Sequence, residues 1–393
     1  MKIKTEPFPT WPFFDQDEIA AVVSVLKSGK VNYWTGEEGK SFEREFADYT
    51  GTRYGIALSN GTVALELALK AAGVGEGDEV VVAPRTFIAS ASSVVLTGAR
   101  PVFADVDRDS GNITAETILP VLTSRTRAII PVHLGGWPCD MDPIMELARE
   151  NGLAVIEDCA QAHGAEYRGR RVGSSGDMGS FSFCQDKIIT TGGEGGMITT
   201  DNQEYWNRIW SLKDHGKSYQ AVFDREHPPG FRWLHESFGT NARMTEMQAA
   251  IGRIALTKLP RWLEIRHRHA EIYTRLLSDL SALHIPQPST DVKSAWYRYY
   301  FHVIPERLKP DWSRDRIMNE IGKLGRPGLS GTCCEIYLEK AFSAVDLRPS
   351  DRLPTARWLT ENSLMLPVHP ALSSEDIEDI AGTVAQVVEE ATG

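Results

Sequence analysis

The sequence lacks any apolar run that approaches 18 residues, and its first 14 residues, "MKIKTEPFPTWPFF", do not contain the apolar stretch of a signal peptide. It also has no internal repeat and no low-complexity tract. Positive charge is in the minority, because 42 Lys and Arg face 53 Asp and Glu, which gives a net charge of -11. A basic surface for nucleic acid is therefore not expected, and neither is a membrane partner. These absences favour a soluble cytoplasmic protein.

Cysteine is scarce and carries no recognisable pattern. The five cysteines, at positions 139, 159, 184, 333 and 334, are odd in number and have no metal-ligand spacing. We expect reduced thiols and no metal site.

Short β-branched segments alternate with helical segments through the first two thirds of the chain. Strands are predicted at 78–84, 100–106, 127–134 and 153–160, and helices at 62–73, 89–99, 115–123 and 141–152. This alternation is typical of a mostly parallel sheet covered by helices on both faces, the α/β class. "DQDEIAAVVSVLKSG" adds an amphipathic helix before it, with Asp15 and Glu18 at capping-box spacing and with Ile19, Val22, Val23 and Leu26 on one face.

The last third has a different composition. A charged helix is predicted at 259–280, a strand at 296–305 and a closing helix at 374–392. We therefore predict a large α/β domain over residues 1–260 and a smaller α+β domain over residues 261–393.

Two glycine-rich segments imitate nucleotide-binding motifs without matching them. "GEEGKS" (Gly36 to Ser41) has two residues between its glycines, where a P-loop needs four. "GVGEGDEV" (Gly73 to Val80) follows a helix and precedes a strand, which is the reverse of the dinucleotide-binding order. Neither segment predicts a nucleotide site.

Polar groups at the carboxyl ends of predicted strands form the candidate site, because ligands of open α/β sheets lie there. "SNGT" (Ser59 to Thr62) stands between a strand and a helix, where free N–H groups suit a phosphate, although a simple N-cap is an alternative. Asp158 ends a hydrophobic strand, where an acid either serves a ligand, caps a helix or forms an ion pair. Lys187 lies in "FSFCQDKIITTGGEGG", five residues after Ser182 and directly before a glycine run.

These groups together match the requirements of pyridoxal phosphate. A partly desolvated lysine is a nucleophile toward an aldehyde, which assigns the cofactor's aldehyde to Lys187. A strand-end carboxylate can hold a protonated ring nitrogen, and this assigns Asp158. The phosphate then belongs to Gly61, Thr62 and Ser182.

Seven segments in order resemble the DegT/DnrJ/EryC1/StrS family of sugar aminotransferases, which have the aspartate-aminotransferase-like fold (fold type I). The resemblance is densest from Gly36 to Gly252. The segments are "SNGTVALELAL", "GDEVVVAPRTFIASAS", "GARPVFADVD", "RAIIPVHLGGWPCDMD", "VIEDCAQAHGA", "FSFCQDKIITTGGEGGMITT" and "FGTNARMTEMQAAIG".

The resemblance implies a role for each site residue. Lys187 is the expected Schiff-base lysine and Asp158 the partner of the ring nitrogen. Gln161 is expected near the ring hydroxyl, and Phe87 is expected to stack on the ring, although by itself Phe87 has the character of a core residue. Asn241 matches a residue that reaches the phosphate from a neighbouring subunit, which implies a homodimer with shared active sites. His163 is either close to the cofactor or a structural histidine.

The implied reaction is a transamination in two halves. L-glutamate or L-glutamine gives its amino group to the cofactor, with the amine of Lys187 moving the proton at the α-carbon. A keto sugar then accepts the nitrogen by the reverse steps. Relatives that carry histidine in place of the lysine run dehydrations, so Lys187 favours transamination.

The acceptor is less well specified by the sequence. Tyr33 and Trp34 are candidate sugar contacts, and Arg85 is a candidate partner for a carboxylate of the donor or the substrate. "SGTCCEIYLEKAF" (Ser330 to Phe342) departs from the Tyr-Pro-Pro-rich segment of nucleotide-sugar members and resembles segments of ketocyclitol aminotransferases. A nucleotide-linked keto sugar, a free keto sugar or sugar acid, and an inosose all stay open. We favour a sugar of a bacterial surface polysaccharide or lipopolysaccharide, and an amino-acid-specific transaminase is the nearest rival.

Overall fold

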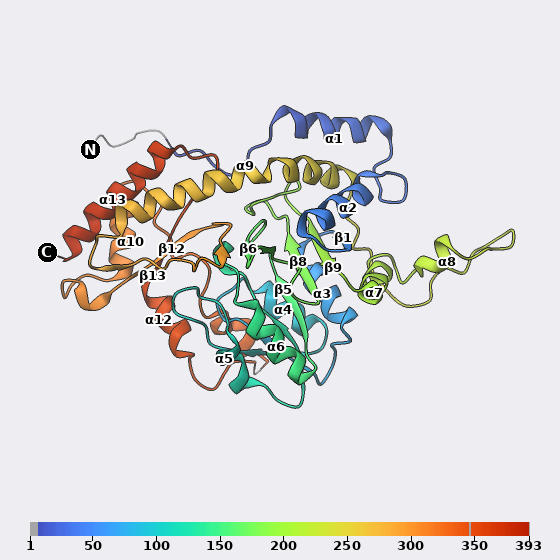
Figure 1. The fold of residues 1–393 in the computed structure, drawn as a ribbon, viewed down its shortest axis with the longest axis horizontal. Coiled ribbons are helices and arrows are strands. Elements are labelled where there is room, and N and C mark those ends of the chain that lie inside the picture. The colour runs from blue at the N-terminus through green and yellow to red at the C-terminus, as the bar shows by residue number, and fades with distance from the viewer. Residues whose placement is uncertain (1–6, 346, 393) are drawn as a thin grey trace.

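The computed structural model describes residues 7–345 and 347–392, and its largest element is a seven-stranded sheet in the order β1-β9-β8-β5-β4-β2-β3 (Figure 1). Only β9 runs antiparallel to its neighbours; the other pairs that join β8, β5, β4, β2 and β3 are parallel. The predicted mostly parallel sheet is thereby confirmed. The strands are β1 (Tyr54–Leu58), β2 (Glu79–Val82), β3 (Arg100–Phe103), β4 (Thr126–Ile130), β5 (Ala154–Asp158), β8 (Met178–Ser182) and β9 (Gly196–Thr200).

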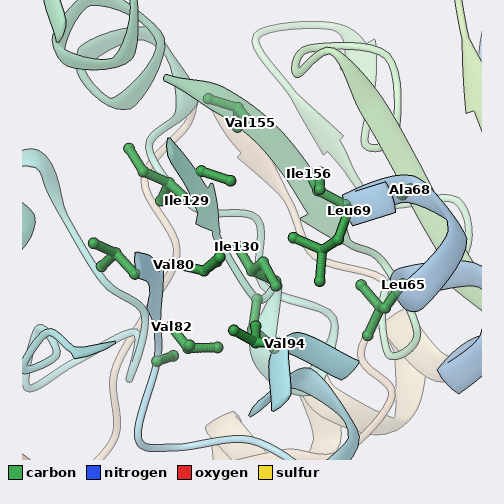
Figure 2. Packing of buried hydrophobic residues seen from close by; sticks show 14 of the residues in the cluster. Leu65, Ala68, Leu69, Val80, Val82, Val94, Ile129, Ile130, Val155 and Ile156 are labelled. Atoms are coloured by element: carbon green, nitrogen blue, oxygen red, sulfur yellow. The ribbon is translucent and has the colours of Figure 1, made fainter. Parts of the chain in front are cut away.

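Helices cover both faces of this sheet. They are α2 (Glu38–Thr50), α3 (Gly61–Ala71), α4 (Ala89–Leu96), α5 (Ala115–Ile118), α6 (Met141–Asn151), α7 (Gln203–Lys213) and α9 (Glu246–Leu277), whereas α8 (Tyr219–Phe223) lies away from the sheet, beyond α7 (Figure 1). On one face, Leu65, Ala68 and Leu69 of α3 and Val94 of α4 pack near Val80, Val82, Ile130 and Ile156 of the strands, while Ile129 and Val155 point to the opposite face (Figure 2). On the other face, α2 and α9 bring Phe42, Phe46 and Leu259 against Phe181 and Met197.

Burial on both faces follows from the strand sequences. Met197 and Ile198 are successive residues of β9, and they belong to different hydrophobic clusters. Because neighbouring side chains of a strand point to opposite faces, a strand of consecutive apolar residues needs cover on both sides. The helices of the alternating sequence pattern supply that cover.

A second core forms around a three-stranded sheet of order β10-β12-β13. Its elements are β10 (Leu283–His284), β12 (Tyr299–Val303), β13 (Ser363–Leu366), α10 (Arg314–Lys323) and α13 (Ser374–Thr392). Between them lie α11 (Lys340–Ser343) and α12 (Pro354–Asn362), while β6 (Glu166–Tyr167), β7 (Arg170–Arg171) and β11 (Val292–Lys293) form a third small sheet. This mixture of helices and antiparallel strands has the character predicted for the C-terminal part.

Helix α9 joins the two large cores. Leu256 and Leu259 in its first half belong to the cluster beneath the large sheet, whereas Tyr273 and Leu277 near its end belong to the C-terminal cluster. The predicted boundary between residues 260 and 261 therefore lies inside a continuous 32-residue helix, next to Pro260. The division into two domains at that point stays a prediction.

The N-terminal helix α1 (Gln16–Ser28) forms as predicted, with the Asp15–Glu18 capping box at its start and left-handed Gly29 at its end. Its apolar stripe is not covered by the rest of the chain, since Ile19, Val23 and Leu26 are 46%, 41% and 55% exposed.

A second exposed apolar region is the segment of residues 217–240, which carries α8 and extends away from the body of the molecule (Figure 1). We call this segment the arm. Phe231, Trp233 and Phe238 of this arm are exposed.

All five cysteines are free, as expected. Within residues 7–345 and 347–392, no helix combines the length and the apolar character that crossing a bilayer requires.

Candidate active site

A cavity of about 1150 Å³ opens beyond the carboxyl ends of β5 and β8, where the topology of an open α/β sheet places ligands. Seven of the sequence-predicted residues line it: Gly61, Thr62, Phe87, Asp158, Gln161, Ser182 and Lys187. They are spread along the chain from residue 61 to residue 187, and we call the side of the cavity that they form the sheet wall. Tyr297, Arg298, Tyr300, Gly331, Thr332, Cys333 and Met365 also line the cavity, and we call these residues the C-terminal wall.

Lys187 follows β8, and both its main chain and its side-chain amine contact other residues. Its main-chain carbonyl accepts a hydrogen bond from the indole Nε1 of Trp11 at 2.8 Å, although 176 residues separate the two. Its Nζ lies 3.8 Å from Oδ1 of Asp186 and 5.2 Å from the centre of the Tyr297 ring. The side chain is 14% exposed, so the amine faces the cavity from a largely desolvated position.

Asp158 ends β5 and points into a network that the sequence did not reveal. Its Oδ2 accepts a hydrogen bond of 2.7 Å from Ser90 Oγ, which in turn lies 2.7 Å from Thr86 Oγ1. Its Oδ1 accepts from the Ala160 amide at 3.2 Å. Burial raises the pKa of the Asp158 carboxyl, against the opposing effects of Ser90, Ala160 and the Lys187 charge. A cationic group bound beside Asp158 favours its ionised form.

The neighbouring Glu157 is a structural residue. Its two oxygens accept hydrogen bonds from His133 Nε2 at 2.9 Å and from the amides of Gly173, Ser175 and Gly176 at 2.9, 2.8 and 2.7 Å. Burial opposes ionisation of Glu157, but these donors outweigh it and lower its pKa. Because every donor comes from the protein, Glu157 fixes the loop before β8 and is not available to a ligand.

A phosphate-sized cradle forms where α3 begins, next to the end of β8. Asn60 caps the helix by accepting a hydrogen bond from the Val63 amide at 2.9 Å, so the N-cap alternative is correct for Asn60. Gly61 is required for the close approach of the two segments, because a Cβ there would lie 2.6 Å from Cβ of Ser182. Its amide and that of Thr62 lie in the first turn of α3, where the helix dipole favours an anion.

The glycine run after Lys187 has the same physical origin. A Cβ on Gly195 would lie 2.1 Å from Thr191 Oγ1, and one on Gly196 would lie 2.4 Å from the Asn60 carbonyl oxygen. Gly196 therefore lets the segment after Lys187 pack closely against the backbone at the start of α3, while Gly192 and Gly193 adopt positive φ angles of 84° and 125°. Close packing and these turn conformations together explain why a lysine stands beside so many glycines.

Phe87 is not a core residue. Its side chain is 67% exposed and lines the cavity, so the core alternative is wrong. Gln161 is held by its Oε1, which accepts a hydrogen bond from the Gly135 amide at 2.9 Å. An aromatic face, a fixed amide, a carboxylate, an amine and an anion cradle thus share one cavity, and this set fits pyridoxal phosphate.

Two predicted substrate residues do not line the cavity. Arg85 is 1% exposed, with its guanidinium 4.6 Å from the centre of the Tyr300 ring and 3.4 Å from Ser363 Oγ, so Tyr300 stands between it and the cavity. His163 is buried against the rings of Phe181 and Phe183. Burial lowers the pKa of His163 to about 3, so its ring is neutral near pH 7. Neither ring nitrogen has a hydrogen-bond partner among the described residues, so both alternatives for His163 stay predictions.

The remaining predicted residues lie outside the cavity of their own chain. Tyr33 is buried and donates a hydrogen bond to Glu43 Oε2 at 3.1 Å, and Trp34 donates to Asp214 Oδ2 at 2.7 Å. Asn241 is exposed at the base of the arm. Their contacts with substrate or cofactor stay predictions that involve a second subunit.

The sequence analysis connected the segment Ser330 to Phe342 of the C-terminal wall with the acceptor, but it missed the rest of this wall and assigned residues 296–305 to a strand without a site role. Tyr300 is its central residue: its Oη lies 3.0 Å from Thr332 Oγ1 and accepts from the Thr332 amide at 3.0 Å. Glycines flank the ring, since a Cβ on Gly331 would lie 2.4 Å and one on Gly135 2.9 Å from it. The cluster of Trp, Tyr and Arg in "WYRYY" was the available signal, because such residues are enriched in binding sites.

Comparison with known proteins agrees with this geometry. The model of the DegT/DnrJ/EryC1/StrS aminotransferase family matches residues 12–385. An aminotransferase structure from Psychrobacter cryohalolentis is 53% identical, covers 98% of this chain and 100% of its own, and superposes with a TM-score of 0.97.

Two further proteins bear on the chemistry. GDP-perosamine synthase of Caulobacter vibrioides is 38% identical over 90% of this chain and 92% of its own. A Streptococcus pneumoniae protein solved in its PLP form is 28% identical over 98% of this chain and 99% of its own, with a TM-score of 0.86.

Proposed function

Because the chain belongs to the DegT/DnrJ/EryC1/StrS aminotransferase family, we propose that it transfers the amino group of L-glutamate or L-glutamine to the carbonyl of a keto sugar. The observation that carries this proposal is the convergence of Lys187, Asp158 and the Gly61–Ser182 cradle on one cavity. A protein that only binds a sugar needs none of these three together.

Pyridoxal phosphate is the proposed cofactor. When bound, it supplies an aldehyde for the amino group and a ring that accepts the electrons released at the donor's α-carbon. Asp158 would hold its ring nitrogen, and the start of α3 with Ser182 would hold its phosphate. Phe87 would cover one face of the ring, and Gln161 would meet its hydroxyl.

The chain's own residues would then orient and move protons. The amine of Lys187, on a side chain that is 14% exposed, would take and return the proton of the donor's α-carbon. The Asp158 carboxyl, whose pKa is raised by burial, would be kept ionised by a protonated ring nitrogen beside it. Ser90 fixes the orientation of that carboxylate through its 2.7 Å hydrogen bond.

A sugar acceptor is supported by the relatives. The Caulobacter relative is by its name a synthase of a GDP-linked amino sugar. A role in the synthesis of a surface polysaccharide follows as part of the proposal.

The proposed active unit is a homodimer with shared sites. The exposed apolar stripe of α1 and the exposed aromatics of the arm are surfaces that a second copy would cover. Asn241, which is exposed, and Trp34, which is partly exposed, lie outside the cavity of their own chain, as residues offered to a partner's cavity would, whereas Tyr33 is buried within its own chain. Sedimentation analysis of the purified protein should give the mass of a dimer, and a monomer at catalytic concentrations would contradict this part.

The absorption spectrum tests the proposal. We expect a visible band from the lysine-bound cofactor, a shift to the aminated form on addition of L-glutamate, and no such band in Lys187→Ala. Titration of the aminated protein with nucleotide-linked and free keto sugars should identify which restores the band. Absence of the band after adding pyridoxal phosphate would contradict the cofactor, and restoration by keto acids alone would favour the amino-acid transaminase.

A further inference from the structure

Arg298 of the C-terminal wall is a cavity-lining guanidinium with few partners. Its side chain is 21% exposed, and among residues 7–345 and 347–392 it donates one hydrogen bond, a long one of 3.5 Å to Tyr297 Oη. Its nearest carboxylate oxygen, Oδ2 of Asp186, lies 3.7 Å away, beyond hydrogen-bond distance. A guanidinium has five N–H donors, so most of its donor capacity is left for a ligand.

Arg298 and Lys187 approach the same two groups. Lys187 Nζ is 3.8 Å from Asp186 Oδ1, and Arg298 is 3.7 Å from the other oxygen of that carboxylate. Both cations also lie over the ring of Tyr297, at 5.2 and 4.5 Å from its centre. Arg298 and Lys187 therefore share the Asp186–Tyr297 side of the cavity, so that Arg298 faces the region where a nitrogen reacts at the position of the Lys187 amine.

Asp186 and Arg266 are the other charged groups next to this ring. Asp186 faces both cations, and it also accepts a hydrogen bond from Tyr297 Oη. Burial opposes its ionisation, but the charge of Lys187, the Tyr297 hydrogen bond and Arg298 together lower its pKa. Arg266 is 1% exposed and has no carboxylate partner among the described residues; burial and then the charge of Arg298 lower its pKa to about 9. Because Glu66, Asp158, Glu194 and Glu339 also line the cavity, it is the free N–H donors of Arg298, and not the net charge of the cavity, that favour an anion at this position.

The backbone holds Arg298 in place at a conformational cost. Trp296 has a φ of +46°, a left-handed conformation that a side chain of this size rarely adopts. The amides of Tyr297 and Arg298 donate to the Gly135 carbonyl, and Arg266 donates to the carbonyls of Trp296 and Tyr297. The amide of the same Gly135 binds Gln161, so the position of Arg298 is tied to the sheet wall.

We infer that Arg298 binds the α-carboxylate of the amino-acid donor, the role that the sequence had suggested for Arg85. In an α-amino acid a single carbon separates the nitrogen from this carboxylate, which matches the closeness of Arg298 to Lys187. The side-chain carboxylate of glutamate lies further along the chain. This inference rests on the proposed function, because it presumes that an amino acid reacts at Lys187.

Donor binding can be measured without turnover. α-Methyl-L-glutamate keeps both carboxylates but lacks the α-proton, so its dissociation constant can be determined by calorimetric titration of the cofactor-loaded protein. We expect Arg298→Gln to raise that constant about 100-fold, through loss of a charge-assisted bidentate contact, and Arg298→Lys to raise it about 10-fold. Arg261→Gln, the same change on an exposed arginine of α9, should leave it unchanged.

The choice of donor distinguishes the two carboxylates. With Arg298→Gln, kcat/KM of the first half-reaction should fall by similar factors for L-glutamate and L-glutamine, since both carry the α-carboxylate. A loss confined to L-glutamate would assign Arg298 to the side-chain carboxylate and overturn the inference. A loss confined to the keto sugar would assign it to the acceptor, and no loss in either would also overturn it.

Failure of the inference and failure of the proposed function give different results. If wild-type protein binds α-methyl-L-glutamate and Arg298→Gln and Arg298→Lys bind it equally well, only the inference fails. If wild-type protein shows neither the cofactor band nor donor binding, the proposed function fails first. The near-ultraviolet circular dichroism of each variant, compared with wild type, reports whether the wall has kept its packing.

Discussion

The two walls of the cavity differ in how their positions are determined. The sheet wall stands on hydrogen-bonded strands, and its segments meet through glycines such as Gly61 and Gly196, where side chains would clash. In the C-terminal wall, Tyr300 and Met365 face each other on the β12–β13 ladder, but Tyr297, Arg298 and the Gly331–Cys333 segment lie outside these strands. This part of the wall depends on contacts between side chains and distant backbone, with Tyr300 set between Thr332, Gly331, Gly135 and Arg85.

This difference suggests that the two walls bind different molecules. The sheet wall carries the groups that suit the cofactor, which both half-reactions share. The C-terminal wall carries groups that suit the molecules that change between the half-reactions, the donor and the acceptor. Substitutions in the sheet wall should therefore affect both half-reactions equally, and substitutions in the C-terminal wall should affect only one.

Asp158→Asn should have the largest effect. Asparagine keeps the shape but not the charge, so the ring nitrogen loses its anionic partner and kcat should fall about 10² to 10³-fold in both half-reactions. Stopped-flow absorbance can follow each half-reaction separately. Asp177→Asn is the matched control, because Asp177 only accepts a hydrogen bond from the Val155 amide and does not line the cavity. Unequal losses of kcat in the two half-reactions would contradict the proposal that the sheet wall serves both of them.

Gly61→Ala should have an intermediate effect, on cofactor affinity. The new Cβ would lie 2.6 Å from Ser182 Cβ, so the start of α3 must move away from β8 and the phosphate cradle widens. Overpacking of this kind costs about 1–3 kcal/mol, which corresponds to a rise in the dissociation constant of pyridoxal phosphate of about 10- to 100-fold. Fluorescence titration of the cofactor-free protein measures it.

Gly75→Ala is the control for Gly61→Ala, since the nearest atom to a Cβ there, the Thr97 carbonyl oxygen, is 3.9 Å away. An unchanged affinity in Gly61→Ala would mean that the phosphate lies elsewhere.

Tyr300→Phe should have the smallest effect, confined to the acceptor. It removes the hydroxyl that lies 3.0 Å from both Thr332 Oγ1 and the Thr332 amide, and with it the restraint on the Gly331–Cys333 segment. Loss of these hydrogen bonds should weaken binding of the keto sugar by about 1 kcal/mol, which corresponds to a rise of about five-fold in its KM, with KM for the donor unchanged. An equal change for the donor would show that Tyr300 serves both molecules.

The sequence predicted the sheet wall well because local pattern and tertiary position coincide there. Parallel strands end at one edge, so Asp158 and Lys187, which follow the ends of β5 and β8, had to meet. The same reasoning assigned Gly61 and Thr62, the resemblance added Phe87 and Gln161, and the structure places all four in the same cavity. The family and the α/β fold are both confirmed by the comparisons.

The C-terminal wall was not predictable by the same reasoning. Arg298 reaches the cavity because Trp296 adopts a left-handed φ and the backbone of residues 295–298 packs on Gly135 and Gly136, and no local propensity signals such a turn. Arg85, which follows strand β2 and was the natural candidate, is covered by Tyr300 from a strand 200 residues further on. Ser90 was missed for a related reason, since only the approach of α4 to β5 makes it a partner of Asp158.

Helix α9 has a mechanical consequence. At 32 residues it spans roughly 48 Å, and its buried side chains are shared between the two large cores. Because α9 is packed into both cores, we expect little rotation of one core relative to the other. Any change of conformation on ligand binding should therefore be confined to the loops and to the arm. For the same reason we expect the two cores to unfold in a single cooperative thermal transition, because unfolding of either core removes part of the packing of α9 on which the other core depends.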